Sequence, residues 1–458
     1  MTSSDKPNIV FIVTDEQRAD SLGCYASQWA STPNIDEIAS SGVVFDEAIT
    51  PAPVCVPART SMLSGRYPSE TGCFSNADLD GGDTTDLVAP FAAAGYTTAS
   101  FGKQHYRGSD HQHLFQQQED IVLSDLVDYT QFNGELDPNE HGALKYPSPY
   151  TNWLLGGRFP GDAEETAEAR IAAKAREFVE TSKRPFFMRL SFNAPQPPVV
   201  PPARFLDHID SSLIDIPSCS NNEVESFPRW LRYYLHEYAG SFRLTESQIA
   251  YMRHCYYAQV AFVDHLVGQV IESLEEHRLL EDTIIVYVSD HGTHLGDHCL
   301  VQKQSFYDPV VRVPFIVRYP GRLSVGRRSE PVSTTSVLPT LMELVGIDIP
   351  NELETRSIAA LLSRPETQDT PTAVFSEFTL ESIKRWGLDY PHKLVMVREG
   401  DWKLCYAPSD PAEGQLFNVK NDPLEIHNHY AQLRESSLVQ GLVSQYERML
   451  ALSSGSAS

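Results

Sequence analysis

The sequence predicts an α/β protein built on a large, mostly parallel sheet with helices on both faces. Residues 7–14 and 284–289 are short, continuous apolar runs rich in β-branched side chains, as is typical of buried parallel strands. A third run, residues 185–192, follows a helical stretch at residues 163–182. Because strands alternate with helices along the chain, an α/β sheet is favoured. Further helix-like segments lie between the strands: residues 34–41 and 251–276.

The C-terminal part of the chain has a different pattern. After about residue 370, short strand-like pieces are separated by turn residues: 373–378, 393–407 and 415–423. A helical stretch at residues 429–451 follows them. We therefore predict a larger α/β domain over residues 1–369. A smaller α+β subdomain, an antiparallel sheet carrying one helix, is predicted over residues 370–458.

Composition and charge restrict the partners that this chain can bind. The 458 residues carry a formal net charge of −25, which disfavours nucleic acid and long anionic polymers because the average field would repel them. No run approaches the roughly 18 apolar residues that span a bilayer. The N-terminus lacks the charged, apolar and small-residue regions of a secretory signal. We expect a cytoplasmic protein without nucleic-acid or membrane partners.

The sequence spacing of the cysteines, and of two of the histidines, does not indicate a metal site. The seven cysteines are scattered, odd in number and without a CxxC pair, which favours neither a disulfide framework nor a zinc site. Most of them are expected to be small buried hydrophobic residues. His294 and His298, in the stretch HGTHLGDH, also lack zinc-binding spacing, and we expect them in a loop near the mouth of a pocket.

Cys55 differs from the other cysteines because it lies between two prolines and just ahead of a helix-like run. Pro57 suits the first turn of a helix, where its missing N–H costs nothing, and ARTSMLSG then continues helically to a glycine. Cys55 is therefore expected at the positive end of a helix beside Arg59, where an anion is favoured. This predicts either a thiolate nucleophile with a lowered pKa or a cysteine buried at a helix start.

Acidic residues directly follow two of the predicted strands. Asp15 and Glu16 end the first strand, and Asp290 with His291 ends another. Ligands bind at the carboxyl ends of the strands in sheets of this kind, and hard divalent cations prefer carboxylate oxygens. A single Asp in this position is commonly a helix cap or a turn residue. Two such clusters together with Cys55 favour a metal site.

Five segments follow one another at the spacing of a known family. CVPAR, residues 55–59, matches the pattern C-x-P-x-R, and GYTTASFGKQHYRG contains a Gly-Lys-x-His segment. The other three are PNIVFIVTDEQRADSLGCYA, TIIVYVSDHGTHLGDHCLVQKQSFYDPVVRVPFIVRYPG and REGDWKLCYAPSDPAEGQLFNVKNDPLE. Together they cover nearly the entire chain. The set resembles the formylglycine-dependent sulfatases, in the choline-sulfatase and arylsulfatase-like branch, which implies an alkaline-phosphatase-like fold and a sulfuric ester hydrolase.

The resemblance implies two chemical groups at the site. Cys55 would be oxidised to formylglycine (3-oxoalanine) by a formylglycine-generating enzyme, and the hydrated aldehyde would attack sulfur. A divalent metal, with Ca²⁺ favoured and Mg²⁺ or Mn²⁺ as alternatives, would be bound by five residues: Asp15, Glu16, Cys55, Asp290 and His291. Oxygen ligation favours calcium or magnesium over zinc.

The same resemblance assigns catalytic and substrate-binding roles. Lys103 and Lys303 would bind the sulfate oxygens in a water-poor pocket. Arg59 would orient the nucleophile, Asp290 would take its proton, and His105 would act as the base when sulfate is released. The substrate would be a small sulfate ester of an aryl, choline or sugar alcohol. The oligomeric state, including a homo-oligomer, stays open.

Three positions bear on how closely the chain follows the family. Gln196, counted here among the substrate-binding residues, stands where a histidine commonly helps to protonate the leaving oxygen, and glutamine can donate a hydrogen bond but no proton. Glu16 stands where Asp is more frequent, so its ligation of the metal stays open. His291 stands where many arylsulfatases have Asn, and the Asp-His form resembles choline-sulfatase-like, phosphonate-hydrolase-like and several carbohydrate-sulfatase branches. Two alternatives therefore remain: a phosphonate monoester or phosphodiester hydrolase of the same superfamily, and a non-catalytic binding protein on this fold.

Overall fold

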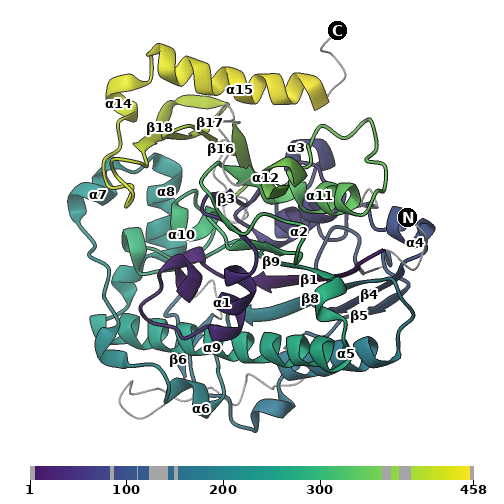
Figure 1. Cartoon of the computed structure of the whole chain (residues 1–458). Coiled ribbons are helices and arrows are strands. Elements are labelled where there is room, and N and C mark those ends of the chain that lie inside the picture. The colour runs from purple at the N-terminus through teal and green to yellow at the C-terminus, as the bar shows by residue number, and fades with distance from the viewer. Residues whose placement is uncertain are drawn as a thin grey trace.

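A computed structural model describes residues 6–82, 87–110, 112–122, 143–148, 153–363, 373–380 and 393–453. An eight-stranded sheet runs through the centre of the molecule, with helices on both sides (Figure 1). From one edge to the other, its strands are β13 (Gly326–Arg328), β2 (Val43–Phe45), β12 (Phe315–Arg318), β9 (Thr283–Ser289), β1 (Asn8–Asp15), β8 (Phe186–Pro195), β4 (Thr97–Gly102) and β5 (Gln117–Glu119). The predicted α/β fold is confirmed.

Strand β1 is the centre of this sheet, with β8 and β9 as its two parallel neighbours. Strand β12 is the antiparallel exception, since it pairs antiparallel with both β9 and β2. The three apolar runs of the sequence form β1, β8 and β9, and every residue of these strands is buried. Such strands are apolar throughout because helices cover both faces.

The alternation of side chains along β1 assigns one helical layer to each face of the sheet. Val10 and Ile12 point into a core formed with α1 (Pro33–Ser40), α5 (Ala167–Thr181) and α9 (Glu246–Glu276). Ile9, Phe11 and Val13 point into a second core. This second core is formed with α2 (Cys55–Ser64), α4 (Ala89–Ala93), α11 (Val337–Leu344) and α12 (Ala359–Ser363).

The C-terminal subdomain is a four-stranded antiparallel sheet with a long helix packed on it (Figure 1). Its strands are β15 (Val374–Phe378), β16 (Leu394–Glu399), β17 (Trp402–Ala407) and β18 (Asp410–Asn418). The sheet is as predicted, but the single predicted helix is two helices, α14 (Tyr430–Leu433) and α15 (Ser437–Ser453). The predicted domain boundary at residues 369 and 370 lies outside the described residues.

Shorter elements include β3 (Ala48–Ile49), β6 (Leu144–Lys145), β7 (Leu154–Gly156), β10 (His294–Leu295), β11 (Val301–Gln302), β14 (Val332–Ser333), α3 (Pro68–Thr71), α6 (Ala203–Leu206), α7 (Asn221–Ser226), α8 (Arg229–Tyr234) and α10 (Asp308–Val311). Among the described residues, none of the helices combines the length and apolar character that crossing a bilayer requires.

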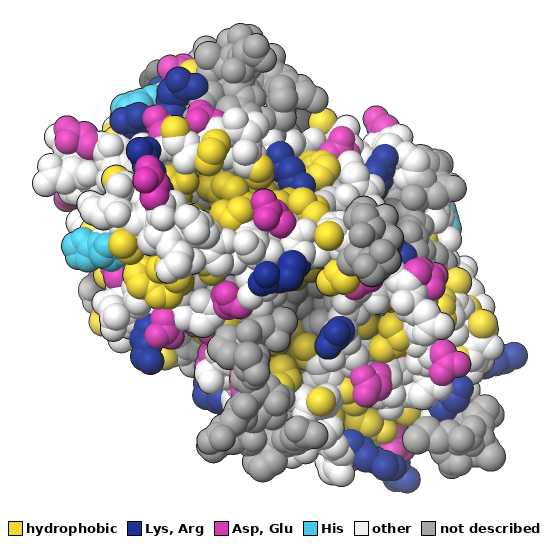
Figure 2. Space-filling model, turned by 90° about the horizontal axis from the view of Figure 1, so that it is seen from above, with side chains coloured by type: hydrophobic (Ala, Val, Ile, Leu, Met, Phe, Trp, Pro, Cys, Tyr) yellow, Lys and Arg dark blue, Asp and Glu magenta, His cyan; other side chains and the backbone are white. Residues whose placement is uncertain are grey.

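On the face that carries α15, basic and acidic side chains are interspersed (Figure 2).

The expectation that the cysteines form no disulfide is wrong for one pair. Cys219 and Cys299 are disulfide-bonded, with their Cα atoms 4.9 Å apart. They are separated by 80 residues in the sequence, so no local spacing indicates the pairing. The five other cysteines are free, and all but Cys24 are buried, as expected for small hydrophobic residues.

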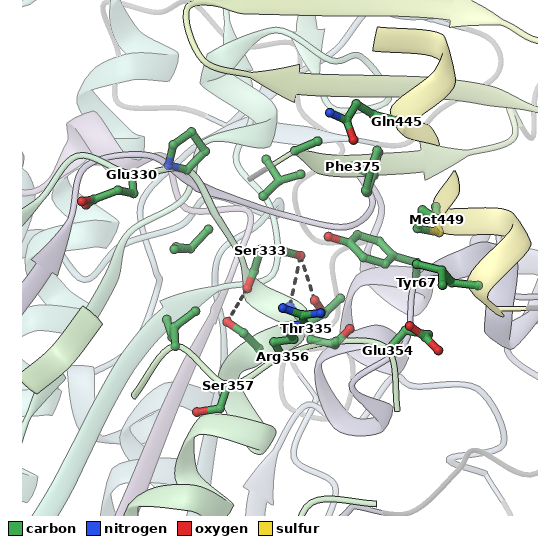
Figure 3. Close-up of a pocket in the computed structure, with 18 of the residues that line it drawn as sticks. Tyr67, Glu330, Ser333, Thr335, Glu354, Arg356, Ser357, Phe375, Gln445 and Met449 are labelled. Carbon is green, nitrogen blue, oxygen red and sulfur yellow. Dashed lines mark hydrogen bonds between the residues drawn. The ribbon is translucent and has the colours of Figure 1, made fainter. Parts of the chain in front are cut away.

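A cavity of about 520 Å³ lies where the subdomain meets the larger domain (Figure 3). Tyr67, Ser333 and Arg356 from the larger domain line it, together with Phe375 and Met449 from the subdomain. None of the site residues predicted from the sequence lines this cavity. It is therefore separate from the predicted catalytic centre.

A buried ion cluster joins the subdomain to the larger domain. Lys403 on β17 is fully buried, and its ammonium lies 2.6 Å from a carboxylate oxygen of Asp308 at the start of α10. It also contacts the carboxylate of Glu425, whose side chain is 1% exposed. Glu425 in turn accepts a hydrogen bond from the backbone N–H of Asp308, at 2.7 Å. The cluster thereby fixes the segment that begins at Lys303 and ends in α10.

Replacing Lys403 by Met should lower the free energy of unfolding by about 3–5 kcal/mol, because the Glu425 carboxylate would be left buried without its partner cation. Chemical denaturation measures the change. Lys420→Met is the matched control, since Lys420 is 72% exposed and its ion pair with Asp401 lies at the surface; it should change the stability by less than about 0.5 kcal/mol. A Lys403→Met protein as stable as the wild type would contradict this account.

Candidate active site

Four buried side chains from three segments meet at the carboxyl ends of the central strands. Asp15 ends β1, Asp290 and His291 follow β9, and Cys55 begins α2. One potential ligand atom from each lies within 4.8 Å of the other three. All four residues are fully buried. The structure thus brings together four of the five residues predicted to bind a metal.

Cys55 occupies the position at the start of α2 that the sequence predicted. Val54 is extended, the helix begins at Cys55, and Pro57 lies in the first turn. The thiol sulfur lies 3.2 Å from Nε2 of His291 and 3.1 Å from Nζ of Lys303. The helix ends at Gly65, whose φ of +66° is the left-handed conformation that glycine adopts readily.

Nearby cations determine the acidity of this thiol. Burial, the largest influence, acts to raise the pKa of Cys55, and Asp15 acts in the same direction. Lys303, Lys103 and His291 outweigh both and lower the pKa to about 6. Position 55 therefore favours a negatively charged group near neutral pH, as proposed for a helix N-terminus beside basic residues.

Arg59, one turn along α2, holds the two aspartates together. Its Nε donates to Asp290 at 2.7 Å, and its Nη2 donates to Asp15 at 2.9 Å. Its Nη1 donates to Oγ of Ser191 at 2.7 Å. Burial acts to raise the pKa of Asp15, but Lys103 and Arg59 hold it well below its usual value. Burial, against the opposing effect of Arg59, raises the pKa of Asp290.

The two predicted sulfate-binding lysines flank this group, each with a side chain 9% exposed. Nζ of Lys103 lies 2.6 Å from an oxygen of Asp15 and donates to Oε1 of Gln196 at 2.6 Å. Nζ of Lys303 lies 3.0 Å from Oε2 of Glu16. Each ammonium group is therefore held by a buried carboxylate, Asp15 or Glu16, and that of Lys103 also by the partly exposed Gln196.

Glu16 is directed toward Lys303. Its φ is +65°, and its second carboxylate oxygen accepts a hydrogen bond from Oγ1 of Thr293 at 2.8 Å. Burial raises the pKa of this carboxyl group, against the opposing effect of Lys303. Glu16 does not belong to the four-residue group described above. Its ligation of a metal stays a prediction.

The two predicted site histidines have different environments. Nδ1 of His291 lies 2.9 Å from the carbonyl oxygen of Gly292. The bonding pattern assigns the Nδ1 proton to this contact, which leaves Nε2 facing Cys55. Burial acts to lower the pKa of His291, but Asp290 outweighs it and raises the pKa to about 9. Burial, followed by Lys103, lowers the pKa of His105 to about 3, so this imidazole is neutral at physiological pH.

The expectation for His294 and His298 at a pocket mouth is wrong, because both side chains are packed inside the protein. Nε2 of His294 contacts Oγ of Ser305 at 2.7 Å, and Nδ1 of His298 contacts a carboxylate oxygen of Glu223 at 2.6 Å. The ring of His298 also stacks on Tyr307, with ring centroids 3.6 Å apart. Ser305 and Tyr307 follow in the same part of the chain, whereas Glu223 lies 75 residues away from His298, so the loop sequence alone does not indicate that contact.

Comparison with known proteins identifies the family that carries this arrangement. The family model described as Sulfatase matches residues 7–347. The chain belongs to the sulfatase family. A second model, described as the C-terminal region of N-sulphoglucosamine sulphohydrolase, matches residues 296–451. The resemblance predicted from the five sequence segments is confirmed.

Several curated relatives of the chain are named as sulfatases. A choline-sulfatase of Rhizobium meliloti (strain 1021) is 29% identical, with 93% of this chain and 83% of the relative covered. An arylsulfatase of Clostridium perfringens (strain 13 / Type A) is 25% identical, with 92% and 90% covered.

Solved structures share the fold. A phosphonate monoester hydrolase of Agrobacterium radiobacter aligns with a TM-score of 0.78 and 21% identity, covering 98% of this chain and 96% of the other. A protein solved in complex with D-glucosamine-2-N,6-O-disulfate aligns with a TM-score of 0.75 and 21% identity, covering 99% of both chains. Because both structures are only 21% identical to this chain, they show a shared alkaline-phosphatase-like fold and nothing further about activity.

Sulfatases generally use a metal and a formylglycine, and the four-residue group has the chemistry to hold a divalent cation. Asp15 and Asp290 supply the carboxylate oxygens that hard cations prefer, and His291 adds an imidazole nitrogen. The two carboxylates are buried with Arg59 as their shared basic partner. Lys103 is a second basic partner of Asp15.

Two polar side chains behind the site were not predicted from the sequence. Ser191 and Arg189 lie on β8, and both contact the residues that hold the site. A signal was available for Arg189, because an arginine interrupts the apolar run PFFMRLSF. The serine carries no such signal.

Removing one carboxylate of the four-residue group should abolish divalent-metal binding. We expect Ca²⁺ or Mg²⁺ to raise the thermal midpoint of the wild-type protein after chelation, by an amount that corresponds to about 2.7 kcal/mol at 100 times the dissociation constant. Asp290→Asn should lose this increase, which calorimetric titration with each cation would confirm. Glu435→Gln, at a carboxylate that is 87% exposed, should retain it. Equal stabilisation of Asp290→Asn and the wild type would exclude this site.

Proposed function

We propose that this protein hydrolyses a small sulfate monoester to an alcohol and inorganic sulfate. The observation that carries the proposal is the position of Cys55. It lies at the positive end of a buried helix, within reach of two aspartates and a histidine, and between two lysines. Membership of the sulfatase family supports the same reaction. A binding protein would not need a nucleophile in this setting.

We assign Cys55 as the residue that a formylglycine-generating enzyme converts to formylglycine. When formed, the hydrated aldehyde supplies an oxygen nucleophile for attack on sulfur and, unlike a thiol, can expel sulfate by reverting to the carbonyl. A divalent cation, Ca²⁺ in preference to Mg²⁺ or Mn²⁺, supplies Lewis-acid polarisation of the sulfuryl oxygens. Asp15, Asp290 and His291 would hold it together with residue 55, and Glu16 is the remaining candidate ligand.

The other site residues bind, orient and move protons. Lys103 and Lys303 bind the sulfate oxygens, because fixed ammonium groups in a pocket with little water stabilise anionic oxygens strongly. Arg59 orients position 55 through the aspartates that it holds. The resemblance assigns His105 as the base when sulfate leaves, and its imidazole is neutral in this environment. Gln196 donates a hydrogen bond to the substrate through its amide nitrogen, since its oxygen accepts from Lys103.

The names of the relatives support a class of substrates, sulfate monoesters, in which the alcohol can be of several kinds. The names choline-sulfatase, arylsulfatase and N-acetylglucosamine-6-O-sulfatase support a choline, an aryl or a sugar sulfate. Phosphonate monoester hydrolysis is the second candidate, because two phosphonate monoester hydrolases align over 97–98% of the chain. Comparing kcat/KM for phenyl sulfate with kcat/KM for phenyl phosphonate monoesters distinguishes the two reactions.

Cys55→Ala should abolish sulfate release while leaving the fold intact, because Cys55 is the one thiol in the cluster formed by the described residues Asp15, Cys55, Asp290 and His291. The measurement is release of inorganic sulfate from 4-nitrophenyl sulfate, choline sulfate and N-acetylglucosamine 6-sulfate, using protein matured with a formylglycine-generating enzyme. Cys24→Ser, at a half-buried free thiol, is the control and should retain activity. Full activity of Cys55→Ala, or no activity of the matured wild type on any of these esters, would reject the proposal.

Gln196→His should increase kcat/KM for alkyl sulfates by about tenfold or more, and by less for 4-nitrophenyl sulfate. Histidine can protonate a poor leaving group, whereas glutamine can only donate a hydrogen bond. The measurement is the dependence of kcat/KM on the leaving-group pKa across a series of esters. Gln196→Asn, which restores no proton donor, should leave this dependence as steep as in the wild type. An equally steep dependence for Gln196→His would place the proton donor elsewhere.

A further inference from the structure

Arg189 is a buried cation in the middle of the central sheet. It lies on β8 between β1 and β4, where its register partners are Phe11 and Ser100. Only 1% of its surface is exposed. No carboxylate among the described residues forms an ion pair with it, and its Nε has no hydrogen-bond partner there. An arginine in this position is costly unless another group offsets its charge.

The guanidinium of Arg189 lies directly behind that of Arg59. Nη2 of Arg189 donates to Oγ of Ser191 at 3.2 Å and to the carbonyl oxygen of Lys103 at 3.3 Å. Nη1 of Arg59 donates to the same two oxygens, at 2.7 Å and 3.3 Å. Arg59 is neutralised by two aspartates, whereas Arg189 shares only neutral acceptors with it. Burial, followed by the repulsion from Arg59, lowers the pKa of Arg189 to about 9.

Arg189 also fixes the segment that carries Lys103 and His105. Besides the carbonyl of Lys103, it donates to Oε1 of Gln104 at 3.2 Å. The segment lies tightly against β8, since Gly102 has a φ of +96° and a Cβ atom there would approach the carbonyl oxygen of Ser191 to 2.1 Å. Arg189 is therefore bonded to the backbone of one sulfate-binding lysine and to the side chain next to it.

We propose that Arg189 is a positioning residue whose unpaired buried charge is offset by the sulfate group when it binds. This inference rests on the proposed function, since it assumes an anionic substrate held between Lys103 and Lys303. The guanidinium holds the backbone of Lys103 in place and adds positive potential behind the anion. It does not touch the substrate, because Arg59 and the segment 102–105 lie between them.

The acceptors of Arg189 keep other partners when the guanidinium is removed. Oγ of Ser191 and the carbonyl of Lys103 retain Arg59, and Oε1 of Gln104 retains a hydrogen bond from Oγ of Ser100 at 3.0 Å. Oγ of Ser100, which accepts from Nη1 of Arg189 at 3.2 Å, keeps its own hydrogen bond to Gln104. A methionine in place of Arg189 therefore leaves each of these buried groups with a hydrogen-bond partner. Replacing a buried, unpaired charge by an apolar side chain of similar length is commonly neutral or stabilising.

The test compares Arg189→Met and Arg189→Lys with the wild type in three measurements. These are the thermal midpoint without ligand, the increase in midpoint caused by inorganic sulfate, and kcat and KM for 4-nitrophenyl sulfate. Arg189→Met should match or exceed the wild-type midpoint without ligand. It should lose most of the sulfate-induced increase, and its kcat/KM should fall about 10- to 100-fold, mainly through KM. Arg189→Lys, which keeps the charge, should retain most of the sulfate effect.

Arg328→Met is the matched control. Arg328 is also buried, at 2% exposed, and donates only to backbone carbonyls on β13 and nearby segments. The Arg328→Met protein should be less stable than the wild type, with an unchanged KM and an unchanged sulfate-induced increase in the thermal midpoint. An Arg189→Met protein with a wild-type sulfate effect and KM, or one that loses only stability, would overturn the inference. If Arg189→Met gives that result and the matured wild type still releases sulfate, only the inference about Arg189 is rejected. If the matured wild type neither binds nor releases sulfate, both this inference and the proposed function are rejected.

Discussion

The pairing of Arg59 with two buried aspartates is the interaction on which the rest of the site depends. Two carboxylates at this depth repel each other, and ionising both requires a cation that is fixed at the same depth. Arg59 bonds to both of them and lies one turn after Cys55 on the same helix. A single helix therefore supplies the candidate nucleophile and the group that organises its surroundings. The ends of β1 and β9 are held against the start of α2 in this way.

Charge around Cys55 is arranged in layers. Lys303 and His291 lie closest to the thiol, at 3.1 and 3.2 Å, and Asp15 follows at 3.7 Å. Lys103 and Arg59 bind Asp15 from the other side, and Arg189 lies behind Arg59. The C-terminal subdomain supports this arrangement from outside. Its Gln415 donates to the hydroxyl of Tyr307, and Lys403 binds Asp308, so the segment after Lys303 is held from both domains. The small antiparallel sheet thus contributes to the site through the segment that follows Lys303.

Much of the fold and the main residues of the site could be predicted because they depend on local patterns. Apolar, β-branched runs gave β1, β8 and β9, and the residues directly after β1 and β9 meet because parallel strands share one carboxyl edge. The disulfide could not be predicted, since Cys219 and Cys299 lie 80 residues apart. The pairing of Glu16 with Lys303 depends on a positive φ and on a partner 287 residues away, and neither is visible in a strand pattern. The C-terminal helix was predicted, but the break before Ser437 was not.

The account makes residue 55 an aldehyde rather than a thiol in the active protein. The most direct measurement is a mass spectrum of the proteolytic peptide that contains position 55, prepared from active protein co-expressed with a formylglycine-generating enzyme and treated with hydroxylamine. The account predicts an oxime adduct at position 55 and none at the other cysteines. An intact, alkylatable thiol at position 55 in protein that releases sulfate would contradict it.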